Sequence, residues 1–116
     1  MAPLLSPGDA MRLRIYIGDD DTFDDRPLAD QIIHAARARG LAGATVTRGT
    51  LSFGPATLEL EIELRLSEDR PIIIDIIDSE AKVTGFVPVV DAMIESGLMT
   101  LEPVTVLRYG RTAKPR

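Results

Sequence analysis

The sequence predicts an α+β fold: a ferredoxin-like βαββαβ domain with an antiparallel sheet and both helices on one face of that sheet. Two observations lead to this prediction. Apolar patterns typical of strands and helices follow one another in the order strand, helix, strand, strand, helix, strand. The 116 residues are enough for one domain with its own core. We expect that domain over residues 11–110, between a flexible leader at 1–10 and a basic, disordered tail at 111–116.

The most apolar stretch, residues 72–77, contains five isoleucines and Asp75. β-branched side chains favour a strand, and alternation along a strand places isoleucines on both of its faces. Two helices cover only one face of such a sheet, so the other face needs a different cover. We expect further copies of the chain to supply it. A monomer whose 58–66 segment folds back over the sheet is the alternative.

Residues 11–17 alternate between apolar side chains and polar or aromatic ones, which predicts the first strand, and Gly18 ends it. The second face of this strand carries Arg12, Arg14 and Tyr16. We expect these side chains to lie on the uncovered face of the sheet or at its rim, where they can pair with Asp75 on a neighbouring strand.

Pro27 predicts the first turn of a helix that ends at Gly40, with Asp24 or Asp25 as its cap. The residues at helical spacing that we expect to face the sheet are Leu28, Ile32, Ala35 and Ala36. The only histidine, His34, falls on the polar side of this helix. We therefore predict that it is exposed to solvent and has no part in metal binding or proton transfer.

Five aspartates lie between positions 19 and 25. Carboxylate oxygens suit Mg²⁺ or Ca²⁺, but the spacing is not that of an EF-hand loop. Phe23 stands at the third ligand position counted from Asp19, and no glutamate follows at the twelfth. Negative charge just before a helix is favourable without any metal. We predict no metal site here.

Three further stretches read as strands. Residues 44–48, flanked by glycines, predict the second strand, and 104–109 predict the last one. A turn signal at 53–55 precedes residues 58–66, which alternate strictly between aliphatic and charged side chains. Such alternation is typical of a half-buried strand or ribbon with an acidic outer face. The sequence leaves open whether 58–66 and 72–77 form one strand or two.

Ser79 predicts the N-cap of the second helix, with Glu80 in its first turn. The apolar stripe of this helix consists of Val83, Phe86, Val87, Val90 and Ile94. Pro88 lies inside the pattern and predicts a kink near residues 84–88. Gly97 is expected to end the helix.

Composition argues against several classes of function. The net charge of −5 and the 4% aromatic content do not favour nucleic-acid binding. Without cysteine, the chain has no disulfide, thiolate zinc site or thiol nucleophile. The apolar runs are shorter than the ~20 residues of a membrane helix, and residues 1–10 do not resemble a secretory signal. We expect a cytoplasmic protein that does not insert into membranes.

Motifs of known enzymes are missing from the sequence. It contains no nucleophile elbow, P-loop or dinucleotide fingerprint. An acylphosphatase-like site needs an asparagine, and the chain has none. We therefore predict that the protein is not an enzyme, and we assign no catalytic residue.

Short motifs spread over the chain carry a family resemblance. They are Ile-Tyr-Ile-Gly at 15–18, Gly-Leu-Ala-Gly-Ala-Thr-Val at 40–46, Arg-Gly at 48–49, Leu-Ser-Glu-Asp at 66–69, Asp-Ser-Glu at 78–80 and Phe-Val-Pro at 86–88. Over about residues 11–109 the chain resembles the DUF190 family of small prokaryotic proteins, relatives of the PII signalling proteins and of the CutA-like trimers. The Gly-Ala-Thr-Val-x-Arg-Gly stretch is the most specific of these motifs.

The resemblance implies a PII-like trimer with clefts between protomers, in which PII relatives bind adenine nucleotides and related small effectors. It also implies a loop, here 50–66, that moves with ligand and meets a partner protein. The connection 97–103 lacks the glycine-and-lysine phosphate cradle of PII proteins. Backbone N–H groups at a glycine-containing turn and guanidinium groups suit phosphate. The candidate anion-binding residues are Arg48, Gly49, Thr50 and Arg108.

Together, these features predict a noncatalytic, PII-like signal-transduction protein that forms a homotrimer. The expected ligand is a small anionic effector such as an adenine nucleotide, bound between subunits, with no cofactor assigned beyond it. The expected partner, besides further copies of the chain, is a membrane transporter or an enzyme. The alternatives are a CutA-like structural or metal-responsive trimer and an unrecognised enzyme.

Overall fold

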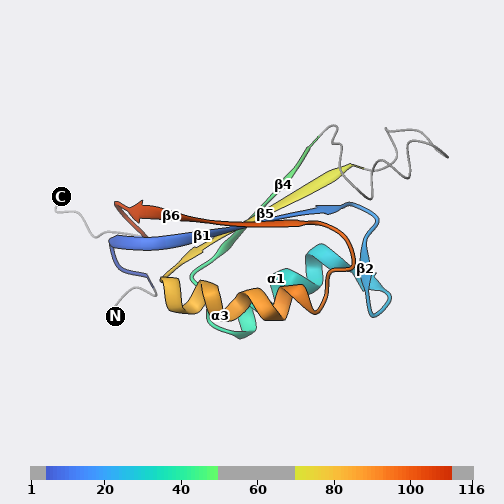
Figure 1. The fold of residues 1–116 in the computed structure, drawn as a ribbon, viewed down its shortest axis with the longest axis horizontal. Helices are drawn as coiled ribbons and strands as arrows, with labels where there is room; N and C mark the ends of the chain where they lie inside the picture. The colour runs from blue at the N-terminus through green and yellow to red at the C-terminus, as the bar shows by residue number, and fades with distance from the viewer. Residues whose placement is uncertain (1–4, 50–69, 111–116) are drawn as a thin grey trace, which may run out of the picture.

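The computed structural model describes residues 5–49 and 70–110. In this part of the chain, four strands form one antiparallel sheet in the order β4-β5-β1-β6, and two helices lie on one face of it (Figure 1). The elements are β1 (Gly8–Gly18), β2 (Thr22–Phe23), β3 (Arg26–Pro27), α1 (Leu28–Ala38), β4 (Ala44–Arg48), β5 (Pro71–Asp78), α3 (Glu80–Asp91) and β6 (Leu98–Val106). The predicted α+β class and antiparallel sheet are confirmed, and the strand order fits the ferredoxin-like plan. The predicted features at 53–55 and 58–66 lie outside the described residues.

β5 lies inside the sheet, between β4 and β1, and its side chains alternate between the two faces as predicted. On the face toward the helices, Ile72, Ile74 and Ile76 are buried. They form the centre of one core cluster whose other buried members are Leu13, Ile15, Ile17, Leu28, Ile32, Ala36, Leu41, Val83, Phe86 and Val90. Burial of an isoleucine side chain contributes about 2 kcal/mol, so this strand anchors the domain.

The two strands nearest the chain ends differ from their predicted bounds. β1 begins at Gly8 rather than at Met11, and its added residues pair with the end of β6. β6 spans Leu98–Val106, so the predicted last strand at 104–109 is wrong in its bounds. The prediction ended the preceding connection at Pro103. Because β6 is an edge strand, proline fits within it, and its missing N–H can face away from the sheet.

The start of α1 is built differently from the prediction. Pro27 is the N-cap of α1. Among the described residues, no side chain forms a capping hydrogen bond at this end of the helix. Asp24 and Asp25 have positive φ angles, 52° and 61°, and form the two-residue turn between β2 and β3. Positive φ at both central residues suits a tight hairpin, and aspartate tolerates it. The predicted aspartate cap is therefore wrong, because the hairpin uses both residues.

α3 begins as predicted, because the Ser79 side chain accepts a hydrogen bond from the N–H of Lys82, at 3.4 Å. The helix continues past Gly85 and Pro88 but ends at Asp91, six residues before the predicted stop at Gly97. The kink near residues 84–88 stays a prediction. Within the described residues, neither helix has the length and apolar character that a bilayer crossing requires.

Gly97 marks a close approach between the chain after α3 and β1. A Cβ atom at Gly97 would stand 2.7 Å from the backbone oxygen of Tyr16, which cannot move aside as a side chain could. We therefore expect Gly97→Ala to lower the free energy of unfolding by about 1–3 kcal/mol, the usual range for overpacking. Urea denaturation measures this loss.

The matched control for this substitution is Gly85→Ala. A Cβ atom at Gly85, inside α3, would have no described atom within 4 Å. Alanine there should raise stability by roughly 0.5–1 kcal/mol through helix propensity alone. Equal stabilities of the two variants would contradict the close approach at Gly97.

Candidate functional site

The side of the sheet away from α1 and α3 is not covered by any described element (Figure 1). On its two central strands this surface, which we call the open face, consists of Arg12, Arg14, Tyr16, Ile73, Asp75 and Ile77. All six are half-buried. The open face therefore combines two isoleucines and a tyrosine with charged side chains in the middle of a sheet.

The charged side chains of the open face are paired. Arg14 forms a bidentate ion pair with Asp75: its Nε donates to Oδ1 at 2.7 Å, and its Nη2 donates to Oδ2 at 3.0 Å. This confirms the predicted pairing with Asp75. Arg12 forms an ion pair with Glu102 of β6. The hydrogen bonds that Arg14 donates to Asp75 raise the pKa of Arg14 above its ordinary value, so Arg14 stays charged throughout the usual pH range.

A second arrangement lies where β4 ends and β5 begins. Gly49 donates its N–H to the Pro71 oxygen at 2.9 Å, and Asp19 donates its N–H to the Arg70 oxygen at 2.8 Å. The guanidinium group of Arg48 forms an ion pair with the carboxylate of Asp19. We call Asp19, Arg48, Gly49, Arg70 and Pro71 the strand-end cluster. In this cluster the solvent-accessible guanidinium group of Arg48 lies beside the backbone of Gly49 at the edge of the sheet.

Gly49 belongs in this cluster for a steric reason. A Cβ atom at this position would stand 2.5 Å from Cγ of Pro71. Any larger residue would push the two strand ends apart and weaken the hydrogen bond between Gly49 and Pro71. Glycine therefore allows the chain on both sides of segment 50–69 to come together.

The structure brings only some of the predicted anion-binding residues together. Arg48 and Gly49 are neighbours in the strand-end cluster, while Thr50 lies outside the described residues. Arg108 follows β6 by two residues, and the end of β6 pairs with Gly8. Arg48 lies near the other end of β1, next to the pairing of Ile72 with Ile17.

The separation between Arg48 and Arg108 follows from the register of the strands. Ile17 lies nine positions after Gly8 along β1, and a strand rises about 3.3 Å per residue. The two arginines are therefore roughly 30 Å apart along the strands. The last residues of β4 and of β6 lie at opposite ends of the sheet (Figure 1). Within one copy of the chain they cannot contact the same small ligand.

The acidic loop at 19–25 is spread out by its local structure. Asp19 pairs with Arg48, Oδ2 of Asp21 accepts the N–H of Gly18 at 2.9 Å, and two further aspartates form the β2–β3 turn. No group of three histidine, aspartate or glutamate side chains suited to a metal ion occurs in residues 5–49 and 70–110. His34 is exposed, as the helical pattern predicted.

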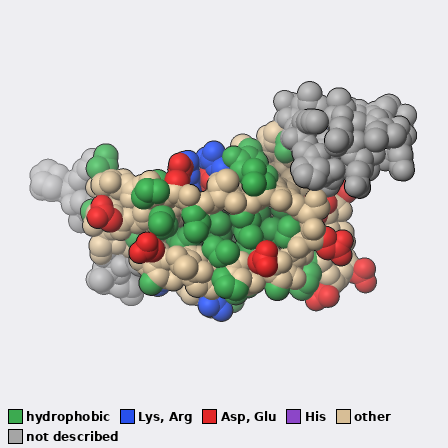
Figure 2. Space-filling model, in the orientation of Figure 1, with side chains coloured by type: hydrophobic (Ala, Val, Ile, Leu, Met, Phe, Trp, Pro, Cys, Tyr) green, Lys and Arg blue, Asp and Glu red, His purple; other side chains and the backbone are tan. Residues whose placement is uncertain are grey.

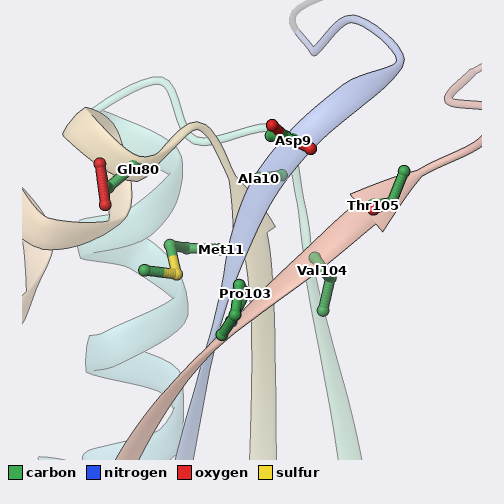
Figure 3. Close-up of a pocket in the computed structure, with 7 residues that line it drawn as sticks. All are labelled: Asp9, Ala10, Met11, Glu80, Pro103, Val104 and Thr105. Carbon is green, nitrogen blue, oxygen red and sulfur yellow. The ribbon is translucent and has the colours of Figure 1, made fainter.

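Among the surface hollows of the described residues, two lie beside the helices. The larger, about 460 Å³, lies between β1, β6 and the start of α3 (Figure 3). Its charged side chains are Asp9 and Glu80, and Met11 reaches from β1 toward α3. The smaller, about 260 Å³, lies between α1 and the start of β4 and contains Arg37. The larger hollow has an acidic lining unsuited to an anion, and neither includes the predicted site residues.

Apolar side chains also gather on the surface over β6 and α3 (Figure 2). Leu98 and Leu101 of β6 are 55% and 45% exposed. The helices cover the centre of the sheet well, whereas β6 and β4 at its edges remain open to solvent. The exposed apolar area of a single copy therefore extends beyond the open face.

The strand-end cluster contains a residue that sequence reasoning did not connect with ligand binding. Asp19 was considered only as part of an acidic loop, although it follows β1 directly. The end of β1 lies beside the start of β5 because the two strands pair antiparallel. A signal for this contact was available in the predicted strand order, since neighbouring antiparallel strands bring their opposite ends together.

These observations define a class: a small α+β protein with two helices on one face of a four-stranded antiparallel sheet and an open second face. The DUF190 family model, described as "Uncharacterized ACR, COG1993", matches residues 10–106. The chain belongs to the DUF190 family, as the motifs predicted.

Two relatives show how far the similarity extends. A UPF0166 protein of Aquifex aeolicus (strain VF5) is 33% identical over 96 residues, which cover 82% of this chain and 90% of that protein. A UPF0166 protein of Methanocaldococcus jannaschii is 31% identical over 77 residues, 66% of this chain and 70% of that protein. The similarity therefore includes most of the domain in both proteins.

Proposed function

We propose that this protein is a PII-like regulator: a noncatalytic homotrimer that binds a small anionic effector, an adenine nucleotide, between its subunits. The observation that carries the proposal is the open face, with its half-buried Ile73 and Ile77 beside the Arg14–Asp75 pair. A single chain would leave this surface in water. Closed symmetric assembly is the common way to cover such a surface.

The polar groups of the open face also favour a partner of matching chemistry. Arg12 and Glu102, like Arg14 and Asp75, alternate positive and negative charge across neighbouring strands. When two copies pack together, the arginines of one copy can face the carboxylates of the other.

The placement of the two arginines supports a ligand site between copies. Arg48 and Arg108 lie at opposite ends of the sheet in one chain, so a shared site needs Arg48 of one copy and Arg108 of another. A guanidinium group and the N–H groups of a glycine turn suit phosphate oxygens. Segment 50–66, outside the described residues, is proposed to respond to the ligand. The target would be a membrane transporter or an enzyme in the cytoplasm.

Nucleotide binding can be tested through thermal stability. We expect at least one of AMP, ADP, ATP and cyclic AMP to raise the melting temperature, because a ligand at 100 times its Kd stabilises the folded state by about 2.7 kcal/mol. Arg48→Gln and Arg108→Gln should each remove most of the shift. Arg39→Gln, at the exposed end of α1, is the control and should keep it. An unchanged shift in Arg48→Gln, or no shift with any of the four, would contradict the proposal.

Mixing the two variants tests whether the site lies between copies. If subunits of Arg48→Gln and Arg108→Gln are exchanged by partial denaturation and refolding, some clefts regain both arginines, each from a different chain. Binding then returns in the mixture although neither variant binds alone. If both arginines acted within one chain, the mixture would stay inactive.

A further inference from the structure

Asp19 contacts the chain on both sides of segment 50–69. Its carboxylate pairs with Arg48, and its own N–H binds the oxygen of Arg70 at 2.8 Å. These contacts join the end of β1 to the end of β4 and to the residue before β5. Asp19 is thus fixed by its backbone while its side chain holds the arginine proposed to bind the effector.

We propose that Asp19 is an internal competitor for the anion site, so that an effector binds Arg48 only by displacing the Asp19 carboxylate. The inference rests on the proposed function, since it concerns the same arginine. It assigns a regulatory role to a residue that would otherwise be an ordinary member of a surface ion pair. The carboxylate occupies Nη1 of Arg48, one of the donors that a phosphate would use.

The chemistry of the two anions is closely matched. Carboxylate and phosphate oxygens both accept paired hydrogen bonds from a guanidinium group. The Asp19 carboxylate is already bound to Nη1 of Arg48, so a phosphate that binds Arg48 through this nitrogen must take its place. An effector must either replace this carboxylate or bind while Arg48 is still paired with Asp19. In both cases its affinity is lower than it would be for an unpaired Arg48.

The exchange can occur without disturbing the core. The Arg48 and Asp19 side chains are 63% and 38% exposed, so the pair faces solvent. Exposed ion pairs are weak, which makes this one easy to break. The backbone contacts of Asp19 with Arg70, and of Gly49 with Pro71, do not involve the carboxylate and can persist after displacement. The competitor therefore stays near the site and can return when the effector leaves.

The experiment compares Asp19→Asn with Asp20→Asn. Both remove one negative charge from neighbouring exposed residues, but within the described residues Asp20 forms no ion pair. Isothermal titration with AMP, ADP, ATP and cyclic AMP at fixed ionic strength gives the Kd of each. We expect Asp19→Asn to bind about threefold to fivefold more tightly than wild type, the factor that loss of an exposed ion pair supplies. Asp20→Asn should change the Kd less than twofold, through screened long-range charge alone.

A double variant shows whether the gain passes through Arg48. In an Arg48→Gln background, adding Asp19→Asn should give no further gain, because the competitor has lost the group for which it competes. Binding detected in Asp19→Asn but too weak to detect in wild type would also support the inference.

Several outcomes would overturn it. If Asp19→Asn and Asp20→Asn bound nucleotide equally more tightly than wild type, the cause would be the loss of one negative charge and not the loss of a competitor for Arg48. Weaker binding in Asp19→Asn would make Asp19 a residue that positions Arg48 for the ligand. Either result overturns the competition while loss of binding in Arg48→Gln still supports the anion site. If wild type and Asp19→Asn both fail to bind all four nucleotides, the proposed function fails and the inference fails with it.

Discussion

Replacing Ile73 by lysine is expected to convert the proposed trimer into single chains of 12.6 kDa. Ile73 lies on the open face opposite Tyr16 of β1 and Thr47 of β4. In a single copy the lysine ammonium reaches water, so the fold tolerates it. In a trimer, every copy would bury one unpaired ammonium group, at a cost of several kcal/mol for each. Light scattering coupled to size exclusion, at micromolar protein, measures the mass.

The matched control is Leu107→Lys. This change also turns an aliphatic side chain into lysine, but Leu107 follows β6 and is 86% exposed. We expect this variant to keep the mass of wild type, three times that of one chain. Far-ultraviolet circular dichroism of the Ile73→Lys variant should match wild type, which separates dissociation from unfolding. A wild-type mass of 12.6 kDa would contradict the trimer, and an unchanged mass of Ile73→Lys would exclude the open face as its interface.

Replacing Asp78 by alanine is expected to cost about 2–4 kcal/mol of stability. Asp78 is 1% exposed, and it ends β5. Its Oδ2 accepts the N–H of Ala42 at 2.9 Å, and its Oδ1 accepts the N–H of Ser79 at 2.7 Å. Alanine would leave these partly buried donors without their buried acceptor, and such a loss at a charged group is among the larger effects of a single substitution.

Asp78 also has a structural task that explains the size of this effect. It ties the chain before β4 to the junction of β5 and α3, two segments 36 positions apart. The Tyr109 hydroxyl donates to the oxygen of the same Ala42 at 2.6 Å. Asp78 and Tyr109 therefore hold the two successive peptide groups on either side of the Cα atom of Ala42, and loss of the carboxylate loosens the end of the sheet where β4 begins.

Two variants check this explanation by thermal denaturation at one protein concentration. Asp78→Asn keeps the shape and one good acceptor, so it should lose about half as much stability as Asp78→Ala. Asp20→Ala removes an exposed carboxylate and should change stability by less than about 0.5 kcal/mol. Similar losses in Asp78→Ala and Asp20→Ala would contradict the role given to the buried carboxylate.

Local patterns explain why much of the fold could be predicted. The five isoleucines of β5 alternate between a buried and a half-buried face, as strand geometry requires. Ser79 caps α3 because a serine side chain can accept a nearby N–H without help from distant residues. The family motifs act at the same local level, and the match over residues 10–106 confirms them. In each case the information lies within about ten neighbouring residues.

The errors arose where contacts between distant residues decided the outcome. Pro103 lies within β6 because that strand is at the edge of the sheet, which a local pattern does not show. Asp24 and Asp25 form a hairpin turn rather than a helix cap, because pairing of β2 with β3 takes both residues. α3 ends at Asp91, and Gly97 instead allows the chain to pass close to β1.

The class of fold, the apolar character of both faces of β5 and the family can be predicted from the order of the residues alone. The contact of Arg48 with Asp19, and its distance from Arg108 at the other end of the sheet, become visible only in the folded domain. The physical reason is that propensity and periodicity act between neighbours along the chain. The register of antiparallel strands sets which distant residues share an end of the sheet, and this register depends on the packing of the whole core.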